Sequence, residues 1–192
     1  MRLHHLLCFA LLAASSCKKD DFDIQNLNGG KILTQGHGGM GIYSTYPLDS
    51  PASILSCLYS GADGSEMDVQ MTSDSVLVAY HHADLSDATD LDGPVISHTW
   101  AEVQQARFEG VPYTEHRITR LDELFASISD PRQYIFTFDI KIYPNGIGDE
   151  IFMDRMADAL IRLLDRFDLA DRVHLESQQT YMLTALQVRR AG

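Results

Sequence analysis

The sequence predicts an α/β fold of the TIM-type (β/α) barrel class, incomplete in this chain, with about five strands. Apolar segments with a two-residue period alternate with segments of helical period, and this order favours parallel strands joined by helical crossovers. Polar residues that could carry chemistry end or follow these strands, and the carboxyl ends of the strands form the catalytic face of such a barrel. The 192 residues suit one domain, whereas a closed eight-stranded barrel typically needs about 250.

The first 16 residues have the pattern of a secretory leader. Arg2 supplies a positive start, an apolar run follows, and Ala14, Ser15 and Ser16 precede Cys17. The run is too short to span a membrane. Small residues directly before a cysteine resemble the bacterial lipoprotein cleavage site, at which the cysteine receives lipid. An ordinary leader cut after a small residue, with Cys17 incidental, is the alternative.

The lipoprotein interpretation divides the chain into three parts. We expect a signal peptide at 1–16, a lipidated Cys17 that begins a polar tether at 17–30, and one domain at 31–192. The protein would then be exported and held in the bacterial cell envelope, with the lipid as its only contact with the membrane. Cys57 is the one cysteine left in the domain, so an intramolecular disulfide is not available, and its apolar surroundings predict a buried side chain.

Composition limits the classes of function. Hydrophobic residues make up 45% of the chain and charged residues 22%, which is enough to form a packed core. The formal net charge of -12 disfavours nucleic acid as a partner, because phosphate neutralisation requires clustered positive charge. The simplest explanation of the acidity is a solvated acidic surface, and metal ligands could account for a modest share of it.

The elements expected in the first half of the domain follow from short local signals. Ser50 and Pro51 form a helix start, with Ser as the N-cap, and Gly61 is a typical helix stop. Polar and apolar residues alternate from Glu66 to Met71, which indicates a strand. The predicted elements are a strand at 31–35, a helix at 51–60, a strand at 66–71 and a strand at 76–80.

The second half contains a polar loop and then further alternation of helix and strand. Thr99 and Thr119 are each predicted to cap a helix, and Asp130-Pro131 is predicted to end the second one. The predicted elements are a loop at 84–95, helices at 101–108 and from 119, a strand at 134–143, a helix from 149, a strand at 172–176 and a helix at 178–189.

Two strands carry paired charges that an apolar environment does not tolerate without a use or a partner. Glu66 and Asp68 are two residues apart and therefore share a strand face, where they repel each other unless a cation lies between them. Asp139 and Lys141 have the same spacing in an otherwise apolar, aromatic strand. Glu66 and Asp68, with His81 after the next strand, predict a site for a hard divalent metal beside an acid–base histidine, and Asp139 and Lys141 are charges that need a use or a partner.

A glycine-dense loop at 36–41 follows the first predicted strand. Its one functional side chain is His37, and glycines allow both sharp turns and close approach of a ligand. A flexible turn with a surface histidine would explain the same residues. The loop alone does not separate these alternatives.

Several short segments of the chain, taken together, resemble one known family. From about 32 to 177 the chain resembles the glycerophosphodiester phosphodiesterases, metal-dependent barrels that hydrolyse glycerol phosphodiesters. The resemblance rests on an ordered set of segments: His37-Gly38-Gly39, Pro47-Leu48-Asp49-Ser50, Gly61-Ala62-Asp63, Glu66-Met67-Asp68-Val69, Thr72-Ser73-Asp74, His81-His82-Ala83-Asp84-Leu85 and Asp139-Ile140-Lys141. Each segment alone is weak, and the set at consistent spacing is specific.

The resemblance implies roles for six residues. Glu66, Asp68 and Asp139 would hold Mg²⁺ or Ca²⁺, both of which prefer oxygen ligands. His37 and His81 would be the acid–base pair, with His37 as base and His81 as acid. Lys141 would bind the substrate, because with the metal it can neutralise the charge of a phosphodiester.

The chain also departs from the family pattern. Gly38 stands where the family has an arginine that would clamp phosphate, Leu48 where it has glutamate, His82 where it has aspartate, and Asp139 where it has glutamate. Two hypotheses follow. The chain is a divalent-metal phosphodiesterase that yields an alcohol and glycerol phosphate, or it is a catalytically degenerate binding module of the cell envelope that captures a phosphorylated ligand.

Overall fold

The computed structural model describes all residues except 1–28, 43, 111, 144–148 and 192. The expected signal peptide, Cys17 and nearly all of the tether lie outside the described residues. The chain divides into two units, Met1–Ile32 and Leu33–Gly192, and every helix and strand described below belongs to the second. None of the helices in the described part combines the length and the apolar character needed to cross a membrane.

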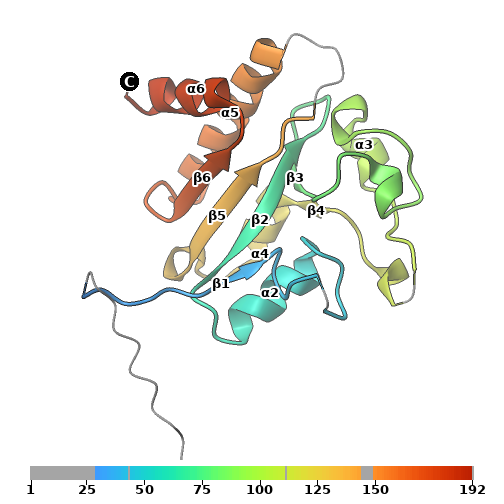
Figure 1. The fold of residues 1–192 in the computed structure, drawn as a ribbon, viewed down its shortest axis with the longest axis horizontal. Helices are drawn as coiled ribbons and strands as arrows, with labels where there is room; N and C mark the ends of the chain where they lie inside the picture. The colour runs from blue at the N-terminus through green and yellow to red at the C-terminus, as the bar shows by residue number, and fades with distance from the viewer. Residues whose placement is uncertain (1–28, 43, 111, 144–148, 192) are drawn as a thin grey trace, which may run out of the picture. The chain divides into compact units, whose positions relative to one another are not determined.

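A six-stranded sheet forms the centre of the second unit (Figure 1). Its strands are β1 (Gln35–His37), β2 (Gly64–Met71), β3 (Leu77–Ala79), β4 (Thr119–Arg120), β5 (Ile135–Ile140) and β6 (Val173–Ser177). The order is β4-β3-β2-β5-β6, and β1 pairs with the first residues of β2. The parallel pairs β1–β2, β2–β5 and β5–β6 confirm the predicted α/β class.

Two strand pairs contradict the expected parallel arrangement. β3 is antiparallel to β2, and β4 is antiparallel to β3. The turn at 72–75 is too short for a crossover connection, so it can only make a hairpin. Thr119 and Arg120 add β4, so the partial sheet of six strands agrees with the expected incomplete barrel of about five.

In the part of the chain that the structure describes, five α-helices and four 3₁₀ turns accompany the sheet. The helices are α2 (Pro51–Tyr59), α3 (Trp100–Val103), α4 (Leu121–Ser127), α5 (Asp149–Arg166) and α6 (Thr180–Ala191). The 3₁₀ turns are η1 (Leu85–Asp87), η2 (Val95–Ser97), η3 (Tyr113–Glu115) and η4 (Pro131–Gln133). The Ser50 cap is confirmed, since its hydroxyl accepts a hydrogen bond from the Ser53 N–H, and Thr99 forms a capping box with Glu102.

Three predicted boundaries were wrong. Thr119 does not cap a helix, because its hydroxyl donates to the carbonyl of Asp49 and its backbone pairs in β4; α4 begins at Leu121 instead. The helix expected at 101–108 is a single turn that ends at Val103. The first strand lies at 35–37 rather than 31–35, because pairing with β2 begins only where Gln35 meets Gly64.

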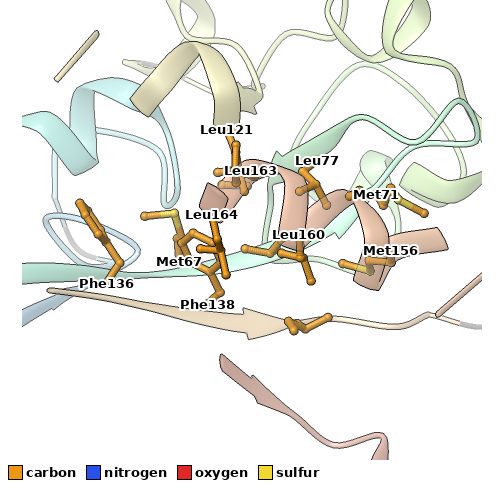
Figure 2. Close-up of a cluster of buried hydrophobic side chains, with 14 of the residues drawn as sticks. Met67, Met71, Leu77, Leu121, Phe136, Phe138, Met156, Leu160, Leu163 and Leu164 are labelled. Carbon is orange, nitrogen blue, oxygen red and sulfur yellow. The ribbon is translucent and has the colours of Figure 1, made fainter. Parts of the chain in front are cut away.

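The main hydrophobic core packs one face of β2 and β5 against α5 (Figure 2). Alternation along β2 directs Met67, Val69 and Met71 to this face, where they meet side chains of β5 and α5. The labelled partners are Phe136, Phe138, Met156, Leu160, Leu163 and Leu164. The same alternation directs Glu66, Asp68 and Gln70 to the opposite face, which carries the polar site.

Candidate metal and acid–base site

Strand register brings three carboxylates together on the polar face of the sheet. Asp68 of β2 pairs in register with Asp139 of β5, and neighbouring residues of parallel strands share a face. Glu66 lies two residues before Asp68, on the same face of β2. One carboxylate oxygen from each of Glu66, Asp68 and Asp139 can be chosen so that all three lie within 4.8 Å of one another. Glu66 and Asp68 are in the middle of β2 rather than at its end, because β2 continues into the β3 hairpin.

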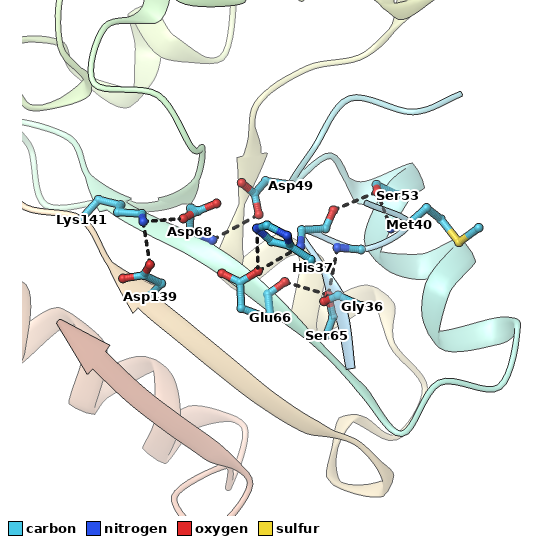
Figure 3. A network of polar contacts seen from close by, with 12 residues as sticks. Gly36, His37, Met40, Asp49, Ser53, Ser65, Glu66, Asp68, Asp139 and Lys141 are labelled. Atoms are coloured by element: carbon cyan, nitrogen blue, oxygen red, sulfur yellow. Dashed lines mark hydrogen bonds and ion pairs between the residues drawn. The ribbon is translucent and has the colours of Figure 1, made fainter. Parts of the chain in front are cut away.

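Lys141 balances part of this negative charge (Figure 3). Its Nζ lies 3.0 Å from Asp68 Oδ1 and 2.6 Å from Asp139 Oδ2. Burial alone would lower the pKa of Lys141, but the hydrogen bonds to Asp139 and Asp68 outweigh it and raise the pKa. Lys141 is therefore a fixed cation at the edge of the carboxylate cluster.

The carboxylate cluster fits a hard divalent cation. Burial, and then repulsion from Asp68, raises the pKa of Glu66 to about 7, although the Gly38 N–H and His37 act in the opposite direction. One Lys ammonium does not compensate three neighbouring carboxylates, and Asp68 Oδ2 is buried without a hydrogen-bond partner. Oxygen donors alone, close together and short of positive charge, suit Mg²⁺ or Ca²⁺.

This electrostatic strain predicts a pH dependence for cation binding. Because folding raises the pKa of Glu66, this residue contributes to the folding stability of the metal-free protein. The contribution is fully present below the ordinary glutamate pKa of 4.5 and is lost as the pH rises through about 7. A cation requires the ionised carboxylate, so we expect its affinity to fall by up to about tenfold per pH unit below about 7. Calorimetric titration of the wild type and Glu66→Gln across this range checks it, since the variant should show a shallower slope. An equal slope in the two proteins would contradict the assignment.

His37 enters the site from β1 and the glycine-dense loop. Its Nε2 lies 3.9 Å from Glu66 Oε2, and its side chain is 67% exposed. The loop is held from both sides, because Gly38 N–H donates to Glu66 Oε2 at 3.0 Å and Gly39 N–H donates to Ser65 Oγ at 3.1 Å. Gly39 has a φ of 88°, which explains a glycine at this position. The loop is thus built around Glu66.

The β2–β3 hairpin returns His81 to the carboxylates. Tyr80 N–H donates to the carbonyl of Asp68 at 2.9 Å, so the next residue, His81, lies beside the carboxylate cluster. Gln70 Nε2 donates to the carbonyls of Tyr80 (2.6 Å) and His82 (2.8 Å), and the Tyr143 hydroxyl donates to the carbonyl of His81 (3.1 Å). Three consecutive carbonyls are therefore fixed around the predicted acid.

His82 is packed differently from its neighbour. Its ring lies edge-on to Tyr80, with 5.7 Å between ring centroids, and its Nδ1 lies 3.4 Å from His81 Nδ1. Burial, and then the charge of His81, lowers the pKa of His82. The charged form of His82 is therefore disfavoured at this position.

All six predicted site residues line one depression of about 270 Å³, together with Glu176. The register explains Glu176, which pairs with Asp139 across β5 and β6. Cys57 lies outside it, buried in α2 as predicted. Trp100 also lies outside, packed under the guanidinium of Arg120.

The sequence reading missed Asp49 and Gln70. Asp49 is buried, has a φ of 62°, and accepts the Asp68 N–H on Oδ1 at 3.2 Å, while its Oδ2 has no hydrogen-bond partner (Figure 3). Burial, and then repulsion from Asp68, raises the pKa of Asp49 well above its ordinary value. Gln70 could have been found, since it continues the Glu66–Asp68 face. Asp49 belongs to the segment at 47–50 that supports the resemblance, but its contact with Asp68 of β2 depends on tertiary structure, so no local pattern assigns it a role.

Two departures from the family pattern are physically linked. A Cβ on Gly38 would lie 2.3 Å from Leu48 Cδ1, and Gly38 has a φ of 53°. The apolar side chain of Leu48 therefore fills the space that a side chain at residue 38 would need. Gly38 and Leu48 therefore accommodate each other in this structure.

This link predicts non-additive stability effects. Gly38→Arg alone should lower the free energy of unfolding by about 2 kcal/mol or more, through the clash and the left-handed backbone. Adding Leu48→Glu should recover at least about 0.5 kcal/mol beyond the sum of the single effects. Urea unfolding of the two single variants and the double variant measures the coupling. Additive effects would show that the positions are independent.

The fold and the site together define a class of protein: an α/β-barrel protein whose sheet carries a carboxylate cluster suited to a divalent cation. Residues 41–189 match the family model described as the glycerophosphoryl diester phosphodiesterase family. The chain belongs to this family, as its sequence segments predicted.

Known relatives agree with this assignment. The chain is 26% identical over 144 residues to a glycerophosphodiester phosphodiesterase of Bacillus altitudinis, and 28% identical over 141 residues to one of Caldanaerobacter subterraneus. Each alignment covers 71% of this chain and 55% of the relative. The chain thus spans about half the length of these curated relatives.

Solved structures confirm the predicted fold. A glycerophosphodiester phosphodiesterase from Parabacteroides distasonis aligns with a TM-score of 0.66 at 21% identity, over 84% of this chain and 63% of that one. A phosphodiesterase from Oleispira antarctica, solved with its product sn-glycerol-3-phosphate, aligns with a TM-score of 0.68 at 22% identity, over 82% and 62%. The sheet of this chain therefore corresponds to part of the barrel in these proteins.

Proposed function

We propose that this chain hydrolyses glycerophosphodiesters to an alcohol and glycerol phosphate, with a divalent cation at Glu66, Asp68 and Asp139. The observation that carries the proposal is the meeting of three carboxylates, one lysine and two histidines in a single depression, in a chain of this family. When bound, Mg²⁺ or Ca²⁺ would neutralise negative charge on the phosphodiester and make phosphorus more electrophilic.

The residues of the chain supply the remaining chemistry. Lys141, held by Asp68 and Asp139, would bind a non-bridging phosphate oxygen. His37 would accept the proton of the attacking oxygen while the bond between that oxygen and phosphorus forms. His81 would donate a proton to the alcohol oxygen as its bond to phosphorus breaks. The position of His81 supports this direction, because His81 lines both the depression and an adjoining aromatic pocket of about 410 Å³, whose walls include Tyr46 and Tyr113.

The direct test is hydrolysis by the purified chain with Mg²⁺, with Ca²⁺ and with a chelator. We expect release of glycerol phosphate with at least one of the cations and none with the chelator. Equal release in the presence of the chelator would overturn the role of the cation. Stoichiometric cation binding without release from any glycerophosphodiester would favour the binding-module hypothesis, which the missing arginine at Gly38 motivates.

A further inference from the structure

In the described part of the chain, one backbone amide of β2 is paired with no neighbouring strand. β1 pairs with β2 only as far as Glu66, where His37 is its partner, and the β3 hairpin begins to pair at Val69. Tyr80 N–H reaches the Asp68 carbonyl, but no strand supplies an acceptor for the Asp68 N–H. A buried N–H without an acceptor is costly, so another group has to supply one.

Asp49 supplies this acceptor. Its Oδ1 accepts the Asp68 N–H at 3.2 Å, as Figure 3 shows. The backbone of Asp49 is fixed as well, since its N–H donates to the carbonyl of Gly38 at 3.0 Å and its carbonyl accepts the hydroxyl of Thr119. Asp49 is fully buried. It therefore joins the loop after β1, the middle of β2 and β4 through three hydrogen bonds.

Asp68, the residue that Asp49 holds, is the most buried of the three proposed cation ligands. Its side chain is 2% exposed, against 22% for Glu66 and 31% for Asp139. Lys141 holds Asp68 Oδ1, whereas Asp68 Oδ2 and Asp49 Oδ2 are both buried without a hydrogen-bond partner. The direction of so buried a carboxylate depends on how the backbone at residue 68 is held.

We propose that Asp49 is a positioning residue of the cation site, which fixes the backbone of β2 so that the Asp68 carboxylate faces Glu66 and Asp139. Asp49 acts through Asp68 and not as a ligand, because it lies outside the depression and outside the group of three carboxylates. The inference rests on the proposed function, since it concerns the cation assigned there. Groups that orient metal ligands typically change the cation affinity by about 10- to 100-fold when they are removed.

Three variants separate positioning from a purely structural role. Asp49→Gly removes the carboxyl and keeps the backbone, because glycine adopts the φ of 62° freely. Asp49→Asn keeps an oxygen that can accept the Asp68 N–H, and asparagine tolerates this backbone conformation. Thr119→Val is the matched control, since it removes a different buried hydrogen bond of Asp49 and leaves the contact with Asp68 in place.

Calorimetric titration with Mg²⁺ and Ca²⁺ measures the cation affinity, and thermal unfolding measures stability. We expect Asp49→Gly to weaken cation binding by about tenfold or more, and Asp49→Asn to stay within about threefold of the wild type. Thr119→Val should lower the Tm and still bind the cation within about threefold of the wild type. Wild-type affinity in Asp49→Gly, or equal weakening in Asp49→Gly and either other variant, would overturn the proposal. Asp49→Ser, whose side chain is shorter than that of aspartate, replaces Asp49→Gly if the glycine variant does not fold.

Amide hydrogen exchange in the metal-free chain keeps this inference distinct from the proposed function. The exchange rate of the Asp68 amide, relative to that of Val69, should be about tenfold or more higher in Asp49→Gly than in the wild type and Asp49→Asn. Val69 is the internal reference because its backbone faces β5, where its carbonyl accepts the Lys141 N–H. An unchanged ratio would overturn the positioning role alone and leave hydrolysis standing. Cation binding by the wild type without hydrolysis would overturn the proposed function, and the affinities of the variants would still decide the role of Asp49.

Discussion

Replacing Glu66 by Gln and Asp68 by Asn together is expected to abolish cation binding and to lower the hydrolysis rate by about 10³-fold or more. The pair contributes two of the three oxygens that lie within 4.8 Å of one another, and Asp139 alone cannot hold a divalent cation against solvent. Amides keep the shape and one oxygen acceptor, so the Gly38 and Lys141 contacts are disturbed less than by alanine. Calorimetry with Mg²⁺ and Ca²⁺, together with product release, measures both effects.

The matched control for this variant is Asp92→Asn with an unchanged Glu66–Asp68 pair, since Asp92 is exposed and lies outside the depression. It should bind the cation and hydrolyse substrate like the wild type. Full hydrolysis by the Glu66→Gln/Asp68→Asn protein would remove the cation from the mechanism. Thermal unfolding of both proteins confirms that they are folded.

The second large effect is expected from His81→Ala. Loss of the proton donor should lower kcat by about 10²- to 10⁴-fold and leave the cation affinity within about threefold, because His81 is not one of the three carboxylate ligands. The loss should shrink for diesters whose leaving alcohol is acidic, such as a nitrophenyl ester, since such an alkoxide departs without a proton. Steady-state kinetics on alkyl and nitrophenyl esters, with calorimetry for the cation, tests this.

His82→Ala is the control for His81. The two histidines are adjacent, but the His82 ring packs against Tyr80 and does not line the carboxylate depression. We expect a loss of about tenfold or less, with the same sensitivity to the leaving alcohol as in the wild type. A larger loss for His82 than for His81 would reverse the assignment of the acid.

Positioning of His81 depends on groups that have no local signal in the sequence around it. Gln70 and Tyr143 donate to three consecutive carbonyls from residue 80 to 82, yet they lie on different strands or beyond them. Gln70 is recognisable afterwards as the next residue of the Glu66–Asp68 face. Tyr143 lies 62 residues from His81, so only the fold brings the two together.

The sequence by itself determined the α/β class, the carboxylate pair and the family, because these depend on short-range order. A two-residue period places Glu66 and Asp68 on one face in any strand, and capping residues such as Ser50 act within one turn of their helix. The sequence also pointed to Asp139 and Lys141 as charges too costly to bury without a use. The structure places Glu66, Asp68, Asp139 and Lys141 around one depression.

Only the tertiary structure decided how these pieces meet. The pairing of β4 with β3, the buried carboxyl of Asp49 beside Asp68, and the mutual fit of Gly38 and Leu48 all depend on contacts between segments that are separated along the chain. The aromatic pocket is assembled in the same way, from several segments between residues 42 and 113 that are separated along the chain. Periodicity reports which face a side chain occupies, whereas register and loop packing determine which side chains share that face in space.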